Sequence, residues 1–165
     1  MRHFTELIYL MLPVYFANMA PPFVKYWHGW NPPISRRYLG DHKTTLGFIL
    51  GIATALAVAL LQSRIQWVGS LVSYDRWISI GVATGLGAML GDSIKSFFKR
   101  RLKISPGESW IPFDQLDFVC GGILALEFWY SFAWLDVIEI VVFSFAADII
   151  VNHVSFFLGI RSTKW

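Results

Sequence analysis

Long apolar segments dominate this sequence and restrict what the chain can fold into. Five stretches are mainly apolar, at residues 4–24, 44–63, 77–98, 113–132 and 134–158. A helix needs about 20 mainly apolar residues to cross the hydrocarbon core of a bilayer, which is about 30 Å thick. The sequence therefore predicts an all-α integral membrane protein with about five transmembrane helices.

The composition supports the same class. Hydrophobic residues make up 55% of the chain and charged residues only 15%, whereas soluble domains average about 45–50% apolar and about 25% charged residues. The excess apolar surface is expected to face lipid. No stretch of the chain has the composition of a separate soluble domain, so residues 1–165 are predicted to form a single transmembrane domain.

Basic residues predict the topology of the chain in the cell membrane, because Lys and Arg are enriched in cytoplasmic loops. One side would carry Lys25, Arg36, Arg37, Lys43, Lys99, Arg100, Arg101, Lys103, Arg161 and Lys164, and the other side only Arg2, Arg64 and Arg76. This asymmetry places the amino terminus outside and the carboxyl terminus in the cytoplasm. The formal net charge of +3 does not indicate nucleic-acid binding, since the basic clusters flank apolar spans.

Glycines recur at helical spacing in the inner stretches. Gly47 and Gly51 form one G-x-x-x-G pair, and Gly81 and Gly85 form another. Such pairs let helix backbones approach closely in a membrane. They predict tight contacts between the second and third helices and their neighbours.

A charged stripe follows the third apolar stretch. Asp92, Lys95, Ser96 and Lys99 are spaced i, i+3, i+4 and i+7, so they share one face of a helix. A charge inside a membrane segment costs about 2.5–3.5 kcal/mol on insertion scales and needs a partner or a purpose. The stripe indicates a site for anionic groups; the alternative is an Asp–Lys ion pair followed by a basic membrane anchor.

Two carboxylates open the fourth stretch. Asp114 and Asp117 are three residues apart and lie on one helix face. Paired carboxylates repel each other unless a cation lies between them, and Mg²⁺ prefers such oxygen ligands and shares them with substrate phosphates. The alternative is an acidic helix start stabilised by the helix dipole.

A short polar turn precedes the second stretch. It contains Lys43 and Thr44 after Gly40, and backbone N–H groups with a cation at a helix start can hold a phosphate. Taken alone, the turn favours a capped helix start over a phosphate site, because it lacks the full Gly-x-x-x-x-Gly-Lys-Ser/Thr spacing. If the topology is right, all three polar groups lie at the cytoplasmic edge of the membrane. Acids for a metal, cations for phosphates and a bilayer for an apolar substrate together indicate nucleotidyl or phosphoryl transfer to a lipid.

Four segments resemble the CTP-dependent cytidylyltransferases of membrane lipids, in particular the CDP-archaeol synthase branch. They are residues 12–21, residues 40–47, residues 91–101, and Pro106-Gly107 followed by Asp114 to Asp117. The chain departs from the family pattern at Leu46, where an arginine is usual, and at Ser35, where an acid is usual.

The resemblance implies an enzyme that transfers CMP from CTP to a lipid phosphate, such as an archaeal-type diether glycerol phosphate, with Mg²⁺ as cofactor. The products would be a CDP-activated lipid and pyrophosphate, for phospholipid synthesis. The lipid tails would lie in a groove between helices. By resemblance, the metal ligands are Asp92, Asp114 and Asp117, the phosphate-binding residues are Lys95, Ser96, Lys99, Arg100 and Arg101, and Asn18, Lys43 and Thr44 border the nucleotide pocket.

Two other functions fit some of these features. A small anion transporter or channel could use the same intramembrane charges together with Glu127, Glu139 and Asp148. An enzyme that consumes a CDP-lipid is disfavoured, because its Asp-Gly-x-x-Ala-Arg motif does not occur here. The sequence leaves the type of lipid tail, the number of metal ions and the oligomeric state open.

Overall fold

The computed structural model describes residues 2–105 and 108–160, and in these ranges the fold is all-helical. Five long helices follow one another along the chain: α1 (Arg2–Met19), α2 (Thr45–Ile65), α3 (Trp77–Arg101), α4 (Phe113–Leu126) and α5 (Trp134–Phe157). There are also two short 3-10 helices. The first, η1 (Pro21–Tyr26), follows α1, and the second, η2 (Tyr74–Arg76), directly precedes α3. No strand occurs in the described residues beyond an isolated bridge between Pro33 and Thr44.

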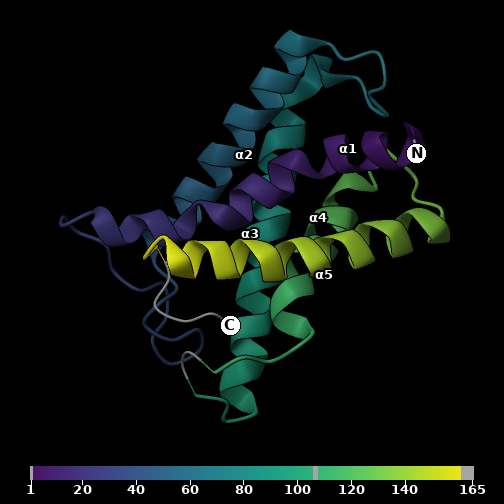
Figure 1. Cartoon of the computed structure of the whole chain (residues 1–165). Helices are drawn as coiled ribbons and strands as arrows, with labels where there is room; N and C mark the ends of the chain where they lie inside the picture. The colour runs from purple at the N-terminus through teal and green to yellow at the C-terminus, as the bar shows by residue number, and fades with distance from the viewer. Residues whose placement is uncertain (1, 106–107, 161–165) are drawn as a thin grey trace.

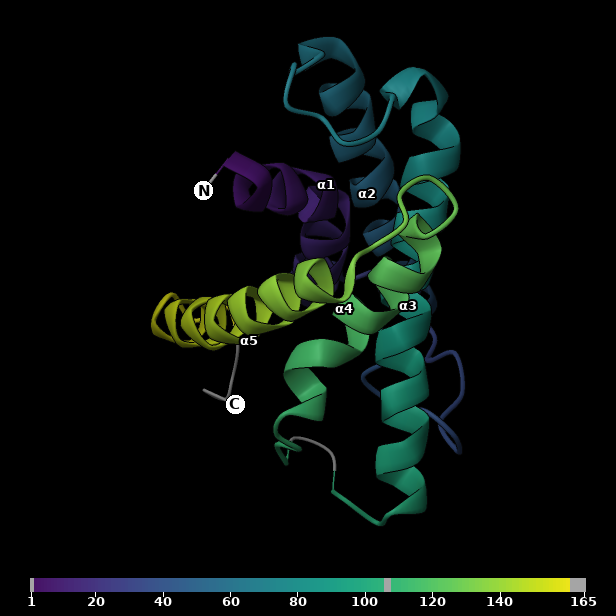
Figure 2. The same cartoon turned by 90° about the vertical axis from the view of Figure 1, so that its right-hand side faces the viewer.

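The helices form two crossing layers. The axes of α2, α3 and α4 are roughly aligned, with α3 antiparallel to the other two, and α1 and α5 cross one face of them (Figures 1 and 2). Helix α3 packs against α1, α2 and α4. Any site on α3 can therefore be completed by side chains from several other helices.

Three helical segments are long and apolar enough to cross a membrane, namely Arg2–Val24, Thr45–Ile65 and Tyr74–Arg101. They match the first three predicted spans. Helix α4 has 14 residues and ends at Leu126, six residues before the predicted end of the fourth span. Its length of about 21 Å is less than the thickness of the hydrocarbon core.

The helical membrane fold predicted from the sequence is thus confirmed. The count of five spans depends on α4 and α5 and stays a prediction, as does the orientation with the amino terminus outside. Two of the residues used for that orientation, Arg161 and Lys164, lie outside the described residues, as do Pro106 and Gly107 of the family motif.

Glycines set the spacing on both sides of α3. A Cβ atom built on Gly81 or Gly85 would lie 2.8 Å from the Cα atom of Leu56 or Ile52 in α2, which is closer than carbon atoms can approach. On the other side, Cβ atoms on Gly91 and Gly121 would collide with backbone carbonyl groups of the facing helix. The predicted glycine packing is therefore present, and it brings α4 against the half of α3 that carries the charges.

The apolar core is centred on α1. Leu7, Leu10, Met11 and Val14 are fully buried and pack in one cluster with residues from the other four helices. The spacing of these residues gives α1 one continuous buried face. Helix α1 thereby fixes the crossing of the two layers.

Candidate active site

Lys95 lies at the centre of a cluster of charged side chains between α3 and α4. Its ammonium nitrogen is 3.2 Å from an oxygen of Asp92, 3.1 Å from Asp114 and 2.8 Å from Asp117. The Lys95 side chain is 14% exposed and that of Asp117 only 5%. One lysine therefore contacts three carboxylates in a largely buried place.

Two further lysines complete this cluster. Lys99 Nζ lies 3.0 Å from Asp114 Oδ2 and donates a hydrogen bond to the backbone carbonyl of Glu108 at 2.5 Å. Lys43 is paired with Asp92. The acid–lysine cluster thus consists of Lys43, Asp92, Lys95, Lys99, Asp114 and Asp117.

Lys43 reaches the cluster because the loop before α2 is held by backbone hydrogen bonds. The Ile34 N–H donates to the Lys43 carbonyl at 2.8 Å, and the Thr45 N–H donates to the Pro32 carbonyl at 3.0 Å. The Asn31 side chain accepts a hydrogen bond from the Leu46 N–H at 3.2 Å. As expected from the sequence, the three polar segments meet in space.

The first turn of α4 orients Asp114 toward α3. The backbone N–H of Trp110 donates a hydrogen bond to Asp114 Oδ2 at 2.6 Å, and the Lys99 ammonium contacts the same carboxylate. The Asp92–Lys95 ion pair expected under the simpler interpretation of the stripe is also present. That interpretation does not include the carboxylates from α4, which contact the same lysine.

The donor chemistry of the cluster suits a hard divalent cation. Three carboxylates converge on one point, and oxygen ligands of this kind are those that Mg²⁺ takes. Asp117 Oδ2 is buried and makes no well-aligned hydrogen bond to any described residue, although the Lys95 ammonium lies 2.8 Å from it. Within the described ranges, no group of three or more acidic, His or Cys side chains is arranged to hold a metal ion directly.

The other predicted site residues lie in different surroundings. The Ser96 hydroxyl donates to the Asp92 carbonyl at 2.8 Å, and Thr44 caps α2 by accepting a hydrogen bond from the Gly47 N–H at 3.2 Å. The Arg100 Nε atom is buried and has no hydrogen-bond partner within the part of the chain that the structure describes. The Arg101 guanidinium lies 5.2 Å from the centre of the Phe97 ring. Asn18 lines a separate cavity of about 260 Å³ between the end of α1 and α5.

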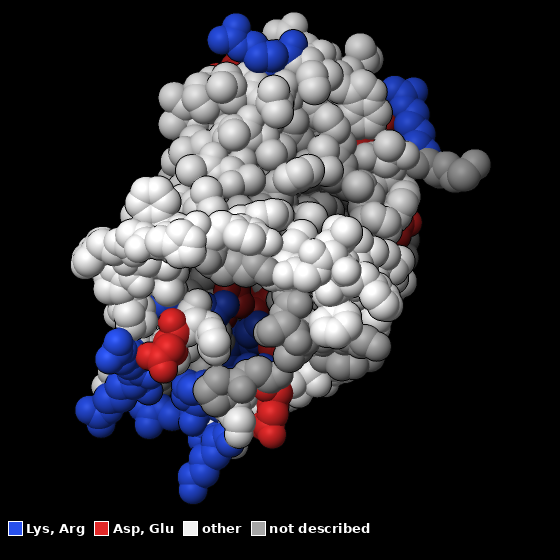
Figure 3. All heavy atoms as spheres, turned by 60° about the vertical axis from the view of Figure 1, so that its left-hand side comes forward, with Lys and Arg blue, Asp and Glu red and all other residues white. Residues whose placement is uncertain are grey.

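The molecule is hollowed near its basic end. In Figure 3, Lys and Arg side chains gather at one end, and a hollow close to them has both acidic and basic side chains on its floor. A polar ligand entering this hollow would meet charges of both signs.

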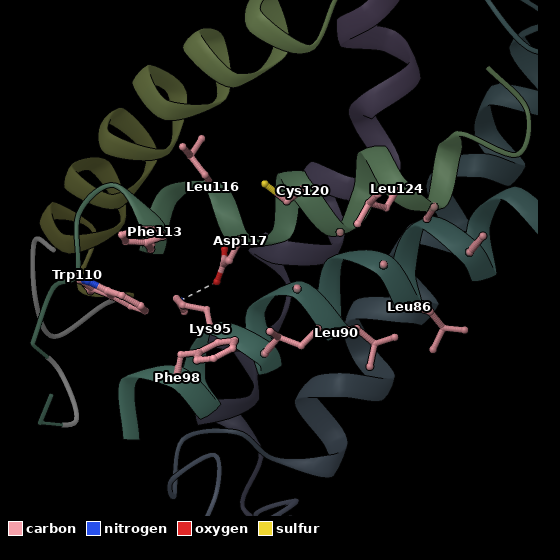
Figure 4. Close-up of a pocket in the computed structure, with 16 residues that line it drawn as sticks. Leu86, Leu90, Lys95, Phe98, Trp110, Phe113, Leu116, Asp117, Cys120 and Leu124 are labelled. Carbon is pink, nitrogen blue, oxygen red and sulfur yellow. Dashed lines mark ion pairs between the residues drawn. The ribbon is translucent and has the colours of Figure 1, made fainter. Parts of the chain in front are cut away.

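An apolar groove of about 720 Å³ runs between α3 and α4 and includes two members of the cluster. Lys95 and Asp117 point toward each other across it (Figure 4). Aromatic residues lie to one side of this pair and aliphatic residues to the other. The aromatic residues are Phe98, Trp110 and Phe113, and the aliphatic residues include Leu86, Leu90 and Leu124.

Sequence reasoning missed two features of α4 and of the segment that precedes it. Gln115 is 1% exposed, and its side-chain oxygen has no hydrogen-bond partner among the described residues. Its position between Asp114 and Asp117 was the only available signal. Trp110 was not predicted to belong to the site, yet its backbone N–H group orients Asp114 and it lines the groove.

Comparison with known proteins identifies the family. The family model described as CarS-like, CDP-archaeol synthase, matches residues 1–165. The chain belongs to the CDP-archaeol synthase family. It is 34% identical to the CDP-archaeol synthase of Sulfurisphaera tokodaii, with 93% of this chain and 92% of the relative covered. It is 32% identical to that of Methanospirillum hungatei, with 94% and 100% covered.

A solved structure agrees with this membership of the CDP-archaeol synthase family. An intramembrane enzyme for archaeal membrane lipid biosynthesis superposes with a TM-score of 0.74 at 28% identity, covering 88% of this chain and 91% of that one. The resemblance drawn from the four sequence segments is therefore confirmed. The transporter interpretation receives no support from these relatives.

Proposed function

We propose that this protein transfers CMP from CTP to a lipid phosphate, giving a CDP-activated lipid and pyrophosphate. One observation carries the proposal, beside the family membership. Two members of the acid–lysine cluster, Lys95 and Asp117, lie in the wall of an apolar groove. A charged reaction centre and a place for hydrocarbon tails are thus combined in one site.

The lipid tails are assigned to the aliphatic part of the groove. Leu86, Leu90 and Leu124 line it, and Leu124 is 72% exposed on the helix surface. A groove open toward the bilayer admits a lipid sideways and leaves its phosphate beside Lys95. Burial of each methylene contributes about 0.8 kcal/mol, so long tails would bind well with few polar contacts.

The lysines of the cluster would bind and orient phosphate groups. In the reaction, an oxygen of the lipid phosphate attacks the α-phosphorus of CTP, and the bond from that phosphorus to the bridging oxygen of the β-phosphate breaks. A lipid phosphate is already anionic, so no side chain is needed as a general base. The tasks left to the protein are to position the two substrates and to neutralise charge. Lys43, Lys95 and Lys99 supply cations for that purpose.

A divalent metal, assigned here as Mg²⁺, would suit the oxygen donors of the three carboxylates of the cluster. Asp92, Asp114 and Asp117 would hold it through their oxygens. When bound, the metal would neutralise charge on the phosphates of CTP and on the departing pyrophosphate. Residues 1–165 would act as one domain, with CTP arriving from the cytoplasm through the hollow.

Peripheral residues are given smaller roles in this proposal. Arg100 and Arg101 would attract the nucleotide phosphates, and Ser96 would support the end of α3. Thr44 and Asn18 would border the nucleotide, although Asn18 lines a cavity against α5. The preferred acceptor would be an archaeal-type diether glycerol phosphate, as the names of the relatives suggest.

The test is transfer of radiolabelled CMP from CTP to lipid by the full-length protein in detergent. A diether and a diacyl glycerol phosphate would be compared, with and without Mg²⁺. Label should enter lipid only with Mg²⁺, and Asp117→Asn should abolish transfer. Asp75→Asn makes the same chemical change at an exposed carboxylate in η2 and should leave transfer intact. Absence of labelled lipid with both acceptors would reject the proposed function.

A further inference from the structure

The place where three carboxylates converge is taken by a side chain of the protein itself. Lys95 Nζ lies 2.8–3.2 Å from Asp92, Asp114 and Asp117. Each of the other two lysines of the cluster contacts only one of these carboxylates. Lys95 is thus the common counter-ion of the three acids.

Lys95 and a metal ion cannot both occupy the position between these three carboxylates. Mg²⁺ binds oxygen at about 2.0–2.1 Å, whereas the ammonium holds the carboxylate oxygens at 2.8 Å or more. The cluster also contains three lysines and three aspartates, so it has no spare negative charge. A divalent cation entering while Lys95 stays in place would be repelled.

We infer that Lys95 occupies the metal position in the ligand-free protein and leaves it when metal and nucleotide bind. The inference rests on the proposed function, since it takes the three carboxylates as metal ligands. The flexible lysine stem lets the ammonium move by side-chain rotation alone. The nucleotide phosphates then give Lys95 a new anionic partner, and the carboxylates are freed for the metal.

This exchange makes metal and nucleotide binding interdependent. Metal alone must displace Lys95 without offering it another anion, so it binds weakly. With CTP present, the phosphates hold Lys95, and metal affinity rises. By linkage, metal raises CTP affinity by the same factor. The ligand-free site keeps its carboxylates paired and does not bind free cations at random.

Mn²⁺ binding followed by electron paramagnetic resonance tests the exchange, using full-length wild-type protein, Lys95→Gln and Lys99→Gln in detergent without lipid acceptor. Lys95→Gln should bind Mn²⁺ without CTP about tenfold or more tightly than wild type, the effect that one adjacent charge commonly has on a carboxylate. CTP should raise Mn²⁺ affinity less in this variant than in wild type. Lys99→Gln, which removes a lysine that also bonds a backbone carbonyl, should gain clearly less affinity. Equal or weaker Mn²⁺ binding by Lys95→Gln would overturn the inference.

Thermal unfolding covers the case in which Lys95→Gln folds poorly. Without metal this variant should unfold at a lower temperature than wild type, and Mn²⁺ should raise its unfolding temperature by more than it raises that of wild type. Lys95→Arg keeps the charge and should keep the weak metal binding. If Lys95→Gln is unfolded with and without Mn²⁺, or if Mn²⁺ stabilises both proteins equally, the exchange is wrong.

The two proposals fail in distinguishable ways. Wild-type protein that transfers no CMP and binds no Mn²⁺ even with CTP would contradict the proposed function. Wild-type protein with metal-dependent transfer, combined with a Lys95→Gln variant that gains no metal affinity, would leave the proposed function intact and remove only the role of Lys95 in metal exchange.

Discussion

Two polar clusters lie within otherwise apolar helices, and they are built differently. The acid–lysine cluster joins α3 and α4 to the loop before α2. The second cluster, here called the His3–Asp136 clasp, joins the start of α1 to the start of α5 and consists of His3, Glu6, Tyr130 and Asp136. Both contain a carboxylate that is almost fully buried, Asp117 in one and Asp136 in the other.

The difference between them lies in how well these carboxylates are satisfied. Asp136 accepts hydrogen bonds from the Tyr130 hydroxyl at 2.9 Å and the Ala133 N–H at 3.1 Å, and His3 lies 2.9 Å from it. Asp117 Oδ1 accepts a hydrogen bond from the Phe118 backbone N–H at 2.6 Å, but Oδ2 contacts only the Lys95 ammonium, at 2.8 Å, and makes no well-aligned hydrogen bond among the described residues. A buried polar network with all its bonds made stabilises one structure, whereas an incomplete one retains capacity to bind a ligand. The clasp is accordingly structural, and the acid–lysine cluster is suited to binding.

The largest expected effect is on transfer activity when the acid–lysine cluster loses a charge. Asp92→Asn should lower kcat for CMP transfer by about 100- to 1,000-fold, the usual cost of removing one preorganised charge-stabilising group. Asp92 contacts both Lys43 and Lys95, so both lysines lose orientation. Steady-state assays with saturating Mg²⁺ measure this loss. Activity within a factor of three of wild type would place the reaction elsewhere.

The converse result is expected in the His3–Asp136 clasp. Asp136→Asn should lower the free energy of unfolding by about 1–3 kcal/mol, because at least one hydrogen-bond donor is left buried without an acceptor. Transfer activity per folded molecule should stay unchanged. Thermal unfolding in detergent and activity assays on the same preparation measure both quantities. A loss of activity without a loss of stability would mean that the clasp is functional and the contrast is wrong.

Part of this contrast could be predicted from the sequence. The i, i+3, i+4, i+7 spacing placed Asp92, Lys95 and Lys99 on one face, and the glycine pair at Gly81 and Gly85 indicated the close α2–α3 contact that the structure contains. These features are local, because helix periodicity alone determines them. Their chemical roles are assigned by the proposal and its tests.

The remaining features depend on contacts between distant segments. The sequence pairs Lys95 with Asp92 three residues away, but not with Asp117, which reaches it only because Gly91 and Gly121 allow α4 to approach. The clasp was missed because His3 and Asp136 are 133 residues apart. The early end of α4 at Leu126 was missed because residues 127–132 contain four aromatic residues and neither proline nor glycine to mark a helix end.

The close approach of α3 and α4 can be tested at one atom. Gly121→Ala adds a Cβ that would collide with the backbone carbonyl of Gly87, and overpacking of this kind typically costs about 1–3 kcal/mol. Because the collision separates the helices that carry Lys95 and Asp117, activity should fall together with stability. Val142→Ala changes an exposed residue of α5 outside the groove and serves as the control. Full activity in Gly121→Ala would mean that the cluster tolerates a wider spacing than the structure has.

Filling the groove should have a smaller effect, and it should change only the KM for the lipid phosphate. Leu124→Trp fills the aliphatic part of the groove, and we expect KM for the lipid phosphate to rise about tenfold, roughly the cost of losing two buried methylenes. The KM for CTP should not change. Val142→Trp places the same side chain at an exposed position of α5 outside the groove and should alter neither constant. Equal effects of the two variants would assign the tails to another surface.

The smallest effect separates helix capping from nucleotide binding at Thr44. Thr44→Ala removes the hydroxyl that accepts from the Gly47 N–H and should cost about 1 kcal/mol of stability. Aspartate is as good an N-cap as threonine, so Thr44→Asp should keep the stability of α2 while adding a negative charge next to Lys43. If Thr44 borders the nucleotide, that charge repels phosphates and KM for CTP rises at normal stability. If Thr44 only caps the helix, KM for CTP stays at the wild-type value in Thr44→Asp, and the residue belongs with the clasp among the structural polar groups.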